Sequence, residues 1–150
     1  VLFPEGELNR NELSRIVFDD SSKKMVLEGI LHPKVFEEEQ KRYESIQEKE
    51  GPVLVFVDAA LLIESGNYKK MNKNIVVTCS DEKRIRRLLE RDSLKKEEIL
   101  KRIQSQAPLS EKVKFADYVI DNNQTIRSLE SQTKKIYTEL TDKLIKSEKD

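Results

Sequence analysis

The apolar run VLVFV at residues 53–57 constrains the fold of this chain more than any other segment. Its β-branched and aromatic residues follow one another without a polar break, and the run is too short for a helix. Continuous runs of this kind are typical of parallel strands that are buried on both faces. Two further candidate strands follow, at 74–79 and 117–121. Helical spacing of apolar residues occurs between and after them, at 82–91, 95–106 and 125–147, so the sequence predicts an α/β fold.

The first fifty residues are predicted to be mainly helical. Apolar residues recur at helical spacing from Leu8 to Val17, and a second apolar cluster occupies 25–31. Pro33 is expected to break the helix, because proline lacks the N–H group and restricts the residue before it. A further helix is expected from Val35 up to Gly51.

The overall composition limits the classes of partner. Lys and Arg number 28, as do Asp and Glu, so the formal net charge is zero. This balance predicts no general attraction to nucleic acid or to an anionic membrane, and any anion site must be local. No apolar run approaches the roughly 18 residues of a membrane span. The single cysteine, Cys79, excludes an internal disulfide and favours a reducing, cytoplasmic location for this single domain of 150 residues.

Glycine residues are scarce, and their spacing excludes a phosphate-binding loop within these residues. The chain has four glycines, and no two of them have the spacing of the motif G-x-x-x-x-G-K-[ST]. Nothing in the sequence replaces the backbone N–H cradle and the lysine of such a loop. These residues alone are therefore expected to form an incomplete nucleoside triphosphate site.

Asp58 directly follows the predicted strand at 53–57. Ligands of open parallel sheets bind beyond the carboxyl ends of the strands, which is where this carboxylate is expected. Two roles suit such a position. The carboxylate orients a substrate hydroxyl group or a metal-bound water, or it only caps the turn that ends the strand.

An arginine-rich helix is predicted after Ser80 and Asp81, either of which is a suitable N-cap. At roughly 100° per residue, Arg84, Arg87 and Arg91 share one face of this helix. Guanidinium groups match phosphate oxygens with paired hydrogen bonds, so this face is a candidate anion site. The alternative is a solvated surface helix balanced by neighbouring carboxylates.

The single histidine, His32, stands before Pro33 next to the apolar cluster at 25–31. By itself it favours a structural role, because no second histidine is present for a familiar metal site. Arg10 follows a turn-like segment at 4–6, and by itself it favours a surface position.

Taken in order, several segments of the sequence resemble those of dephospho-coenzyme A kinases. They are GELNR (6–10), IVF (16–18), LE (27–28), HP (32–33), DAALLIESG (58–66), RLLER (87–91), RIQSQ (102–106), EK (111–112) and ADYVIDN (116–122). The resemblance implies transfer of the γ-phosphoryl group of ATP to the 3′-hydroxyl of dephospho-coenzyme A, with Mg²⁺ accompanying ATP. It also implies a P-loop kinase-like parallel sheet flanked by helices. The first strand and the phosphate loop of that fold are absent from this sequence, so the chain is expected to be catalytically incomplete.

The resemblance further implies an organisation for the chain, a single kinase domain fragment. Residues 7–50 would form a helical substrate-binding region, 51–81 and 108–150 the core, and 82–107 a helical lid. The implied dephospho-coenzyme A contacts are Arg10, His32 and Asp58. The implied ATP contacts are Arg87, Arg91, Arg102, Gln106 and Asn122, of which Arg87 and Arg91 are also the implied catalytic residues.

Two alternatives stay open. Another P-loop nucleoside or nucleotide kinase would share the arginine-bearing lid but should lack the pattern of Arg10 with His32-Pro33. A non-catalytic α/β nucleotide-binding module would keep the cleft without turnover. The acceptor used separates the two kinds of kinase, and tight binding of dephospho-coenzyme A without turnover, by a sample of verified full length, would favour the binding module.

Overall fold

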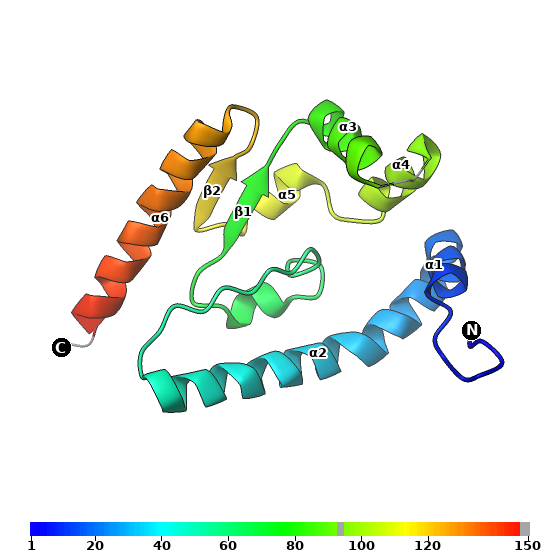
Figure 1. Cartoon of the computed structure of the whole chain (residues 1–150), viewed down its shortest axis with the longest axis horizontal. Coiled ribbons are helices and arrows are strands. Elements are labelled where there is room, and N and C mark those ends of the chain that lie inside the picture. The colour runs from blue at the N-terminus through cyan, green and yellow to red at the C-terminus, as the bar shows by residue number, and fades with distance from the viewer. Residues whose placement is uncertain (93–94, 148–150) are drawn as a thin grey trace. The chain divides into compact units, whose positions relative to one another are not determined.

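The computed structural model describes residues 1–92 and 95–147 (Figure 1). The α-helices are α1 (Arg10–Asp19), α2 (Ser21–Glu50), α3 (Asp81–Arg91), α4 (Lys96–Gln104), α5 (Leu109–Val113) and α6 (Ile126–Ser147). The strands are β1 (Ile75–Thr78) and β2 (Tyr118–Asp121), and a short 3₁₀ helix, η1, covers Asn67–Lys70. Residues 93–94 of the predicted lid and 148–150 of the predicted core lie outside the described residues.

The chain divides into two compact units, Val1–Lys41 and Arg42–Asp150, and each is described by itself. In the first unit, Asp20 separates α1 from α2. Its backbone is extended, and its carboxylate accepts a hydrogen bond from the Ser22 N–H at 2.9 Å, which starts the second helix.

The predicted helix break at Pro33 is wrong, because α2 continues through this residue. Proline inside a helix removes one backbone hydrogen bond and crowds the carbonyl of the residue four positions earlier. The helix has 30 residues, and because helix propagation is cooperative, its other turns can offset that single loss. The prediction that residues 7–50 are mainly helical is confirmed.

In the second unit, β1 and β2 form a parallel pair in which Val76 is opposite Val119 and Val77 is opposite Ile120. Both strands were predicted, and the α/β class with a parallel sheet flanked by helices is confirmed. Helix α6 follows β2 and packs beside it (Figure 1). Val76, Ile120 and Leu140 are buried where the sheet and its helices meet.

The remaining predicted strand, the one at 53–57, is not formed. In the described part of the chain no strand pairs with this segment, so its backbone N–H and C=O groups have no ladder to join. Its side chains are not buried either, since Val55 is 40% and Phe56 60% exposed. The composition of the apolar run favours extended structure, but it does not show whether a neighbouring strand is present to pair with it.

The short elements α5 and η1 were not predicted, because stretches of four or five residues carry too little periodicity. The ring of Tyr68 in η1 contacts that of Phe115, just after α5, at a centroid distance of 4.7 Å. Gly66 precedes η1 with a φ of 76°, a left-handed conformation that glycine adopts without strain. Among the described helices, none is both long and apolar enough to cross a membrane.

Candidate functional site

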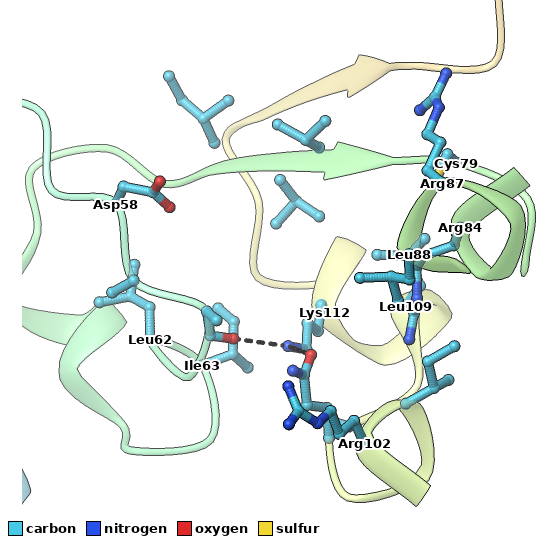
Figure 2. Close-up of a pocket in the computed structure, with 18 of the residues that line it drawn as sticks. Asp58, Leu62, Ile63, Cys79, Arg84, Arg87, Leu88, Arg102, Leu109 and Lys112 are labelled. Atoms are coloured by element: carbon cyan, nitrogen blue, oxygen red, sulfur yellow. Dashed lines mark hydrogen bonds between the residues drawn. The ribbon is translucent and has the colours of Figure 1, made fainter. Parts of the chain in front are cut away.

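A cavity of about 640 Å³ lies in the unit Arg42–Asp150 (Figure 2). Residues of β1, α3, α4, α5 and the segment 57–63 line it. Its charged lining residues are Asp58, Arg84, Arg87, Arg91, Asp92, Arg102 and Lys112. Five of these are basic and two are acidic, so a neutral chain contains a locally positive cavity.

Helix α3 contributes most of the positive charge. Ser80, one of the two predicted candidates, is its N-cap, and its hydroxyl accepts a hydrogen bond from the Lys83 N–H at 3.4 Å. The predicted common face of Arg84, Arg87 and Arg91 is confirmed, because all three line the cavity.

Arg87 is held at the carboxyl end of β1 (Figure 2). Its Nη2 donates a hydrogen bond to the Asn122 carbonyl at 3.2 Å. The N–H of Asn122 in turn donates to the carbonyl of Thr78, the last residue of β1, at 2.8 Å. Two residues implied at the ATP site are therefore in direct contact, although Asn122 is not among the residues that line the cavity.

The start of α3 is tied to the same loop. The Ser80 N–H donates to Asn123 Oδ1 at 2.8 Å, and the Lys83 ammonium donates to the Asn123 carbonyl. Because Asn122 is also bonded through its N–H to Thr78, this end of α3 is connected to the sheet through the loop at 122–123.

Arg91 occupies the other end of α3 and carries a carboxylate partner. Its Nε and Nη2 donate to the two carboxylate oxygens of Asp92 at 2.7 and 3.0 Å. This hydrogen bonding raises the pKa of the Arg91 guanidinium and lowers the pKa of Asp92. The Arg91 side chain remains 73% exposed, so an anionic ligand can reach it and compete with Asp92.

Asp58 lines the same cavity as the arginines, but it is exposed and lies toward the amino end of β1, away from Arg87 (Figure 2). The prediction that Asp58 follows the carboxyl end of a strand is wrong, because residues 53–57 do not form one. Arg102 and Gln106, both implied at the ATP site, also line the cavity.

Arg10 and His32 belong to the unit Val1–Lys41. Arg10 is exposed and is the first residue of α1, while His32 is half-buried within α2. Their proposed contact with dephospho-coenzyme A stays a prediction.

Sequence reasoning missed an ion pair at the wall of the cavity. Lys112 of α5 lies with its Nζ 2.8 Å from Glu64 Oε1, and the two side chains are only 13% and 22% exposed. The Ala107 N–H donates to the same Glu64 oxygen at 2.9 Å. The one sequence signal was that Glu64 and Lys112 both lie in segments that resemble the kinase family, which gives no indication that they pair.

This ion pair predicts a pH-dependent contribution to stability. Burial raises the pKa of Glu64, but hydrogen bonds from Lys112 and the Ala107 N–H outweigh it, so the pKa lies below its ordinary value. A carboxyl whose pKa is lower in the folded state stabilises fully above its unfolded pKa, and this contribution is lost as the pH falls through the folded pKa. The parent should therefore exceed Glu64→Gln in unfolding free energy near neutral pH, and the difference should shrink below about pH 4.5. Urea denaturation of both proteins across this range measures it, and a difference independent of pH would contradict the ionised pair.

Comparisons with known proteins agree on one family. The family model CoaE, dephospho-CoA kinase, matches residues 1–128. The dephospho-CoA kinase of Listeria monocytogenes is 42% identical over 141 residues, which are 92% of this chain and 67% of the relative. That of Aquifex aeolicus is 39% identical over 141 residues, 94% of this chain and 70% of the relative.

Two solved structures are also similar. The crystal structure of TT1252 from Thermus thermophilus has a TM-score of 0.73 and 34% identity, covering 93% of this chain and 71% of that one. The dephospho-CoA kinase from Campylobacter jejuni has a TM-score of 0.63 and 29% identity, covering 94% and 69%. The chain thus spans about two thirds of the length of these relatives.

Proposed function

This chain belongs to the dephospho-coenzyme A kinase family, ATP-dependent kinases of the last step of coenzyme A biosynthesis, and we propose that its arginine-lined cavity binds the phosphates of ATP. The observation that carries the proposal is the presence of four guanidinium groups, from Arg84, Arg87, Arg91 and Arg102, in one cavity. Guanidinium groups are complementary to phosphate oxygens and remain charged at any physiological pH. The γ-phosphoryl group of ATP is then transferred to the 3′-hydroxyl of dephospho-coenzyme A.

Arg87 and Arg91 are proposed to contact the transferring phosphoryl group, with Arg102 and Gln106 on the neighbouring phosphates. The adenine of ATP is proposed to lie near the loop at 121–122. The hydrogen bond from Arg87 to the Asn122 carbonyl supports this position, because it connects a phosphate-binding side chain directly to that loop. The roles of these residues are carried over from the family segments in which they stand.

Phosphoryl transfer needs positioning and charge stabilisation more than covalent chemistry from the protein. Its transition state spreads negative charge over the phosphoryl oxygens, where fixed guanidinium groups stabilise it. Arg91 has Asp92 as its partner in this structure. Exchange of this carboxylate for a phosphate would keep a negative partner beside Arg91 throughout, which lowers the cost of desolvating the cation.

Residues 82–107 are proposed to act as the lid. Its first end is held by the contacts of Lys83 and Arg87 with the loop at 122–123, and its second end by the bond from the Ala107 N–H to Glu64. Closure would then move the part between these anchors, the end of α3 together with α4. Lid closure of this kind excludes water from the transferring group.

On the acceptor side, Arg10, His32 and Asp58 are proposed to contact dephospho-coenzyme A. The position of Asp58 supports an acceptor site separate from the phosphate site, because Asp58 lines the same cavity as the arginines but lies apart from Arg87 (Figure 2). A carboxylate there can accept a hydrogen bond from a hydroxyl group of the acceptor.

The residues present fit a magnesium ion that arrives with the nucleotide. No group of three or more potential ligands is found among the described residues, so this part of the chain offers no dedicated cage. Magnesium commonly takes most of its ligands from phosphates and water, with one or two carboxylates. The two cavity carboxylates, Asp58 and Asp92, are the acidic side chains that could contribute such a ligand. When bound, the ion would neutralise phosphate charge.

The proposal predicts release of ADP from ATP and Mg²⁺ that depends on dephospho-coenzyme A, in a protein that carries a phosphate-binding loop in addition to these residues. The sample should be of verified intact mass, and the phosphorylated product should carry its new phosphate on the 3′-oxygen, as ³¹P NMR can show. Transfer to AMP or to a nucleoside instead would favour another nucleotide kinase. Tight binding of dephospho-coenzyme A without any turnover, by a sample whose mass shows that such a loop is present, would favour a non-catalytic binding module. Absence of turnover in these 150 residues alone would fit the expected catalytic incompleteness. The cytoplasmic location predicted from the sequence stays a prediction that fractionation of cells would test.

A further inference from the structure

Lys112 lies at the cavity wall but uses its hydrogen-bonding capacity on the protein. Its Nζ contacts Glu64 Oε1 at 2.8 Å and donates to the Ala60 carbonyl at 3.0 Å and to Gln106 Oε1 at 3.4 Å. An ammonium group has three N–H donors, so these three acceptors account for all of them. Figure 2 shows Lys112 beside the loop that follows Asp58. The lysine is thus placed to hold other groups rather than to bind a ligand itself.

The contact with Lys112 determines how the Gln106 amide is oriented. An ammonium group only donates hydrogen bonds, so it must face the amide oxygen, and the reversed amide would bring NH₂ against NH₃⁺. The amide NH₂ group is then left available on a side chain that lines the cavity. An NH₂ group suits an oxygen-rich anion, whereas an amide oxygen would repel it.

Glu64 keeps this arrangement neutral and in place. The same carboxylate oxygen accepts from Lys112 and from the N–H of Ala107, the residue next to Gln106. The ion pair therefore contacts both the Gln106 side-chain amide, through Lys112, and the peptide N–H that follows it, through Glu64. Despite the opposing effect of burial, hydrogen bonds from Lys112 and the Ala107 N–H hold the pKa of Glu64 below its ordinary value, so the carboxylate stays ionised and paired as the pH falls below neutral.

We propose that Lys112 and Glu64 are positioning residues that orient the Gln106 amide so that its NH₂ group donates to a polyphosphate in the cavity. The inference rests on the proposed function, and it adds two residues that act through a third. Lys112 contributes to anion binding even though its own donors are all used within the protein.

A double-mutant cycle on the intact protein tests this coupling. The variants are Lys112→Met, Gln106→Ala and the combination, and the probe is inorganic triphosphate, with its dissociation constant measured by calorimetry. Each single variant should weaken binding by about tenfold, as expected for loss of one hydrogen bond to a charged group. Glu64→Gln accompanies Lys112→Met in each case, so that no unpaired carboxylate is left beside the anion. In the Gln106→Ala background, Lys112→Met should then have almost no further effect. The KM for ATP should follow the same pattern.

Matched controls keep the result interpretable. Lys114→Met makes the same chemical change two positions along the chain at a residue that is 63% exposed and paired with Glu111, and it should leave binding unchanged. Gln106→Glu serves if Lys112→Met does not fold. It retains an acceptor for Lys112 but replaces the NH₂ group with a negative charge, so it should bind triphosphate more weakly than Gln106→Ala.

Equal losses from Lys112→Met in both backgrounds would overturn the inference, because the lysine would then act on its own or through the fold alone. Binding by Gln106→Glu as tight as that of the parent, or a parent that binds no triphosphate, would also overturn it. The predicted coupling in a protein that transfers nothing to dephospho-coenzyme A would support the inference and contradict only the proposed acceptor.

Discussion

In a protein that also supplies the phosphate-binding loop, replacement of Arg91 by alanine is expected to lower turnover by at least about 100-fold, the scale found when one donor to a transition-state oxygen is removed. Arg91 lines the cavity, and its side chain is 73% exposed with Asp92 as its partner. An exposed side chain of this kind contributes little to folding, so the unfolding midpoint should barely change. Steady-state ADP release with saturating ATP and dephospho-coenzyme A measures the effect on kcat.

Arg86→Ala is the matched control for this prediction. Arg86 stands on the same helix, α3, with a side chain that is 65% exposed and a salt bridge to Glu90 at 3.8 Å, and it does not line the cavity. Its loss should leave turnover within about twofold of the parent, since surface charges away from a site have small effects. Comparable turnover in Arg91→Ala and Arg86→Ala would refute the lid assignment.

Replacement of Ile99 by alanine should lower the unfolding free energy by about 2–5 kcal/mol. Ile99 of α4 has no exposed surface, and α4 packs against α3. Removing its outer carbons takes away buried apolar surface and leaves a space that a close-packed pair of helices fills only partly. Urea denaturation followed by circular dichroism measures the difference.

Two control variants test whether the loss of stability comes from the burial of Ile99 rather than from the isoleucine-to-alanine change itself. Ile99→Val removes one methyl group and should cost about 0.5–1.5 kcal/mol. Ile126→Ala makes the same change as Ile99→Ala at a residue that is 75% exposed, and it should change the unfolding free energy by only about 0.5 kcal/mol. A loss at Ile99 no larger than that at Ile126 would contradict the packing of α4 described above.

The predictions from sequence succeeded where the information is local. The strands β1 and β2 were predicted from short β-branched runs, and the arginine face of α3 followed from helical spacing after Ser80. Each of these patterns is read from residues within one element. Helix capping and side-chain periodicity act over three or four positions, so neighbouring residues are sufficient to determine them.

Two predictions failed where a local pattern depends on its surroundings. The run at 53–57 has the composition of a buried strand, but a strand also needs a neighbour to accept and donate its hydrogen bonds. Pro33 has the chemistry of a helix breaker, but α2 tolerates it because the rest of the helix remains bonded. In both cases the intrinsic preference of the residues was interpreted correctly, but the effect of the surrounding structure on it was not.

By itself, the sequence determined the fold class, the family and the basic face of α3, because these depend on spacing and on ordered segments. Only the tertiary structure decided that Lys112, Glu64 and Gln106 form one network at the cavity wall. Its hydrogen bonds join residues 43 and 52 positions apart, from Glu64 to Ala107 and from Ala60 to Lys112. No periodicity encodes such contacts, because folding alone brings distant acceptors within reach of one ammonium group.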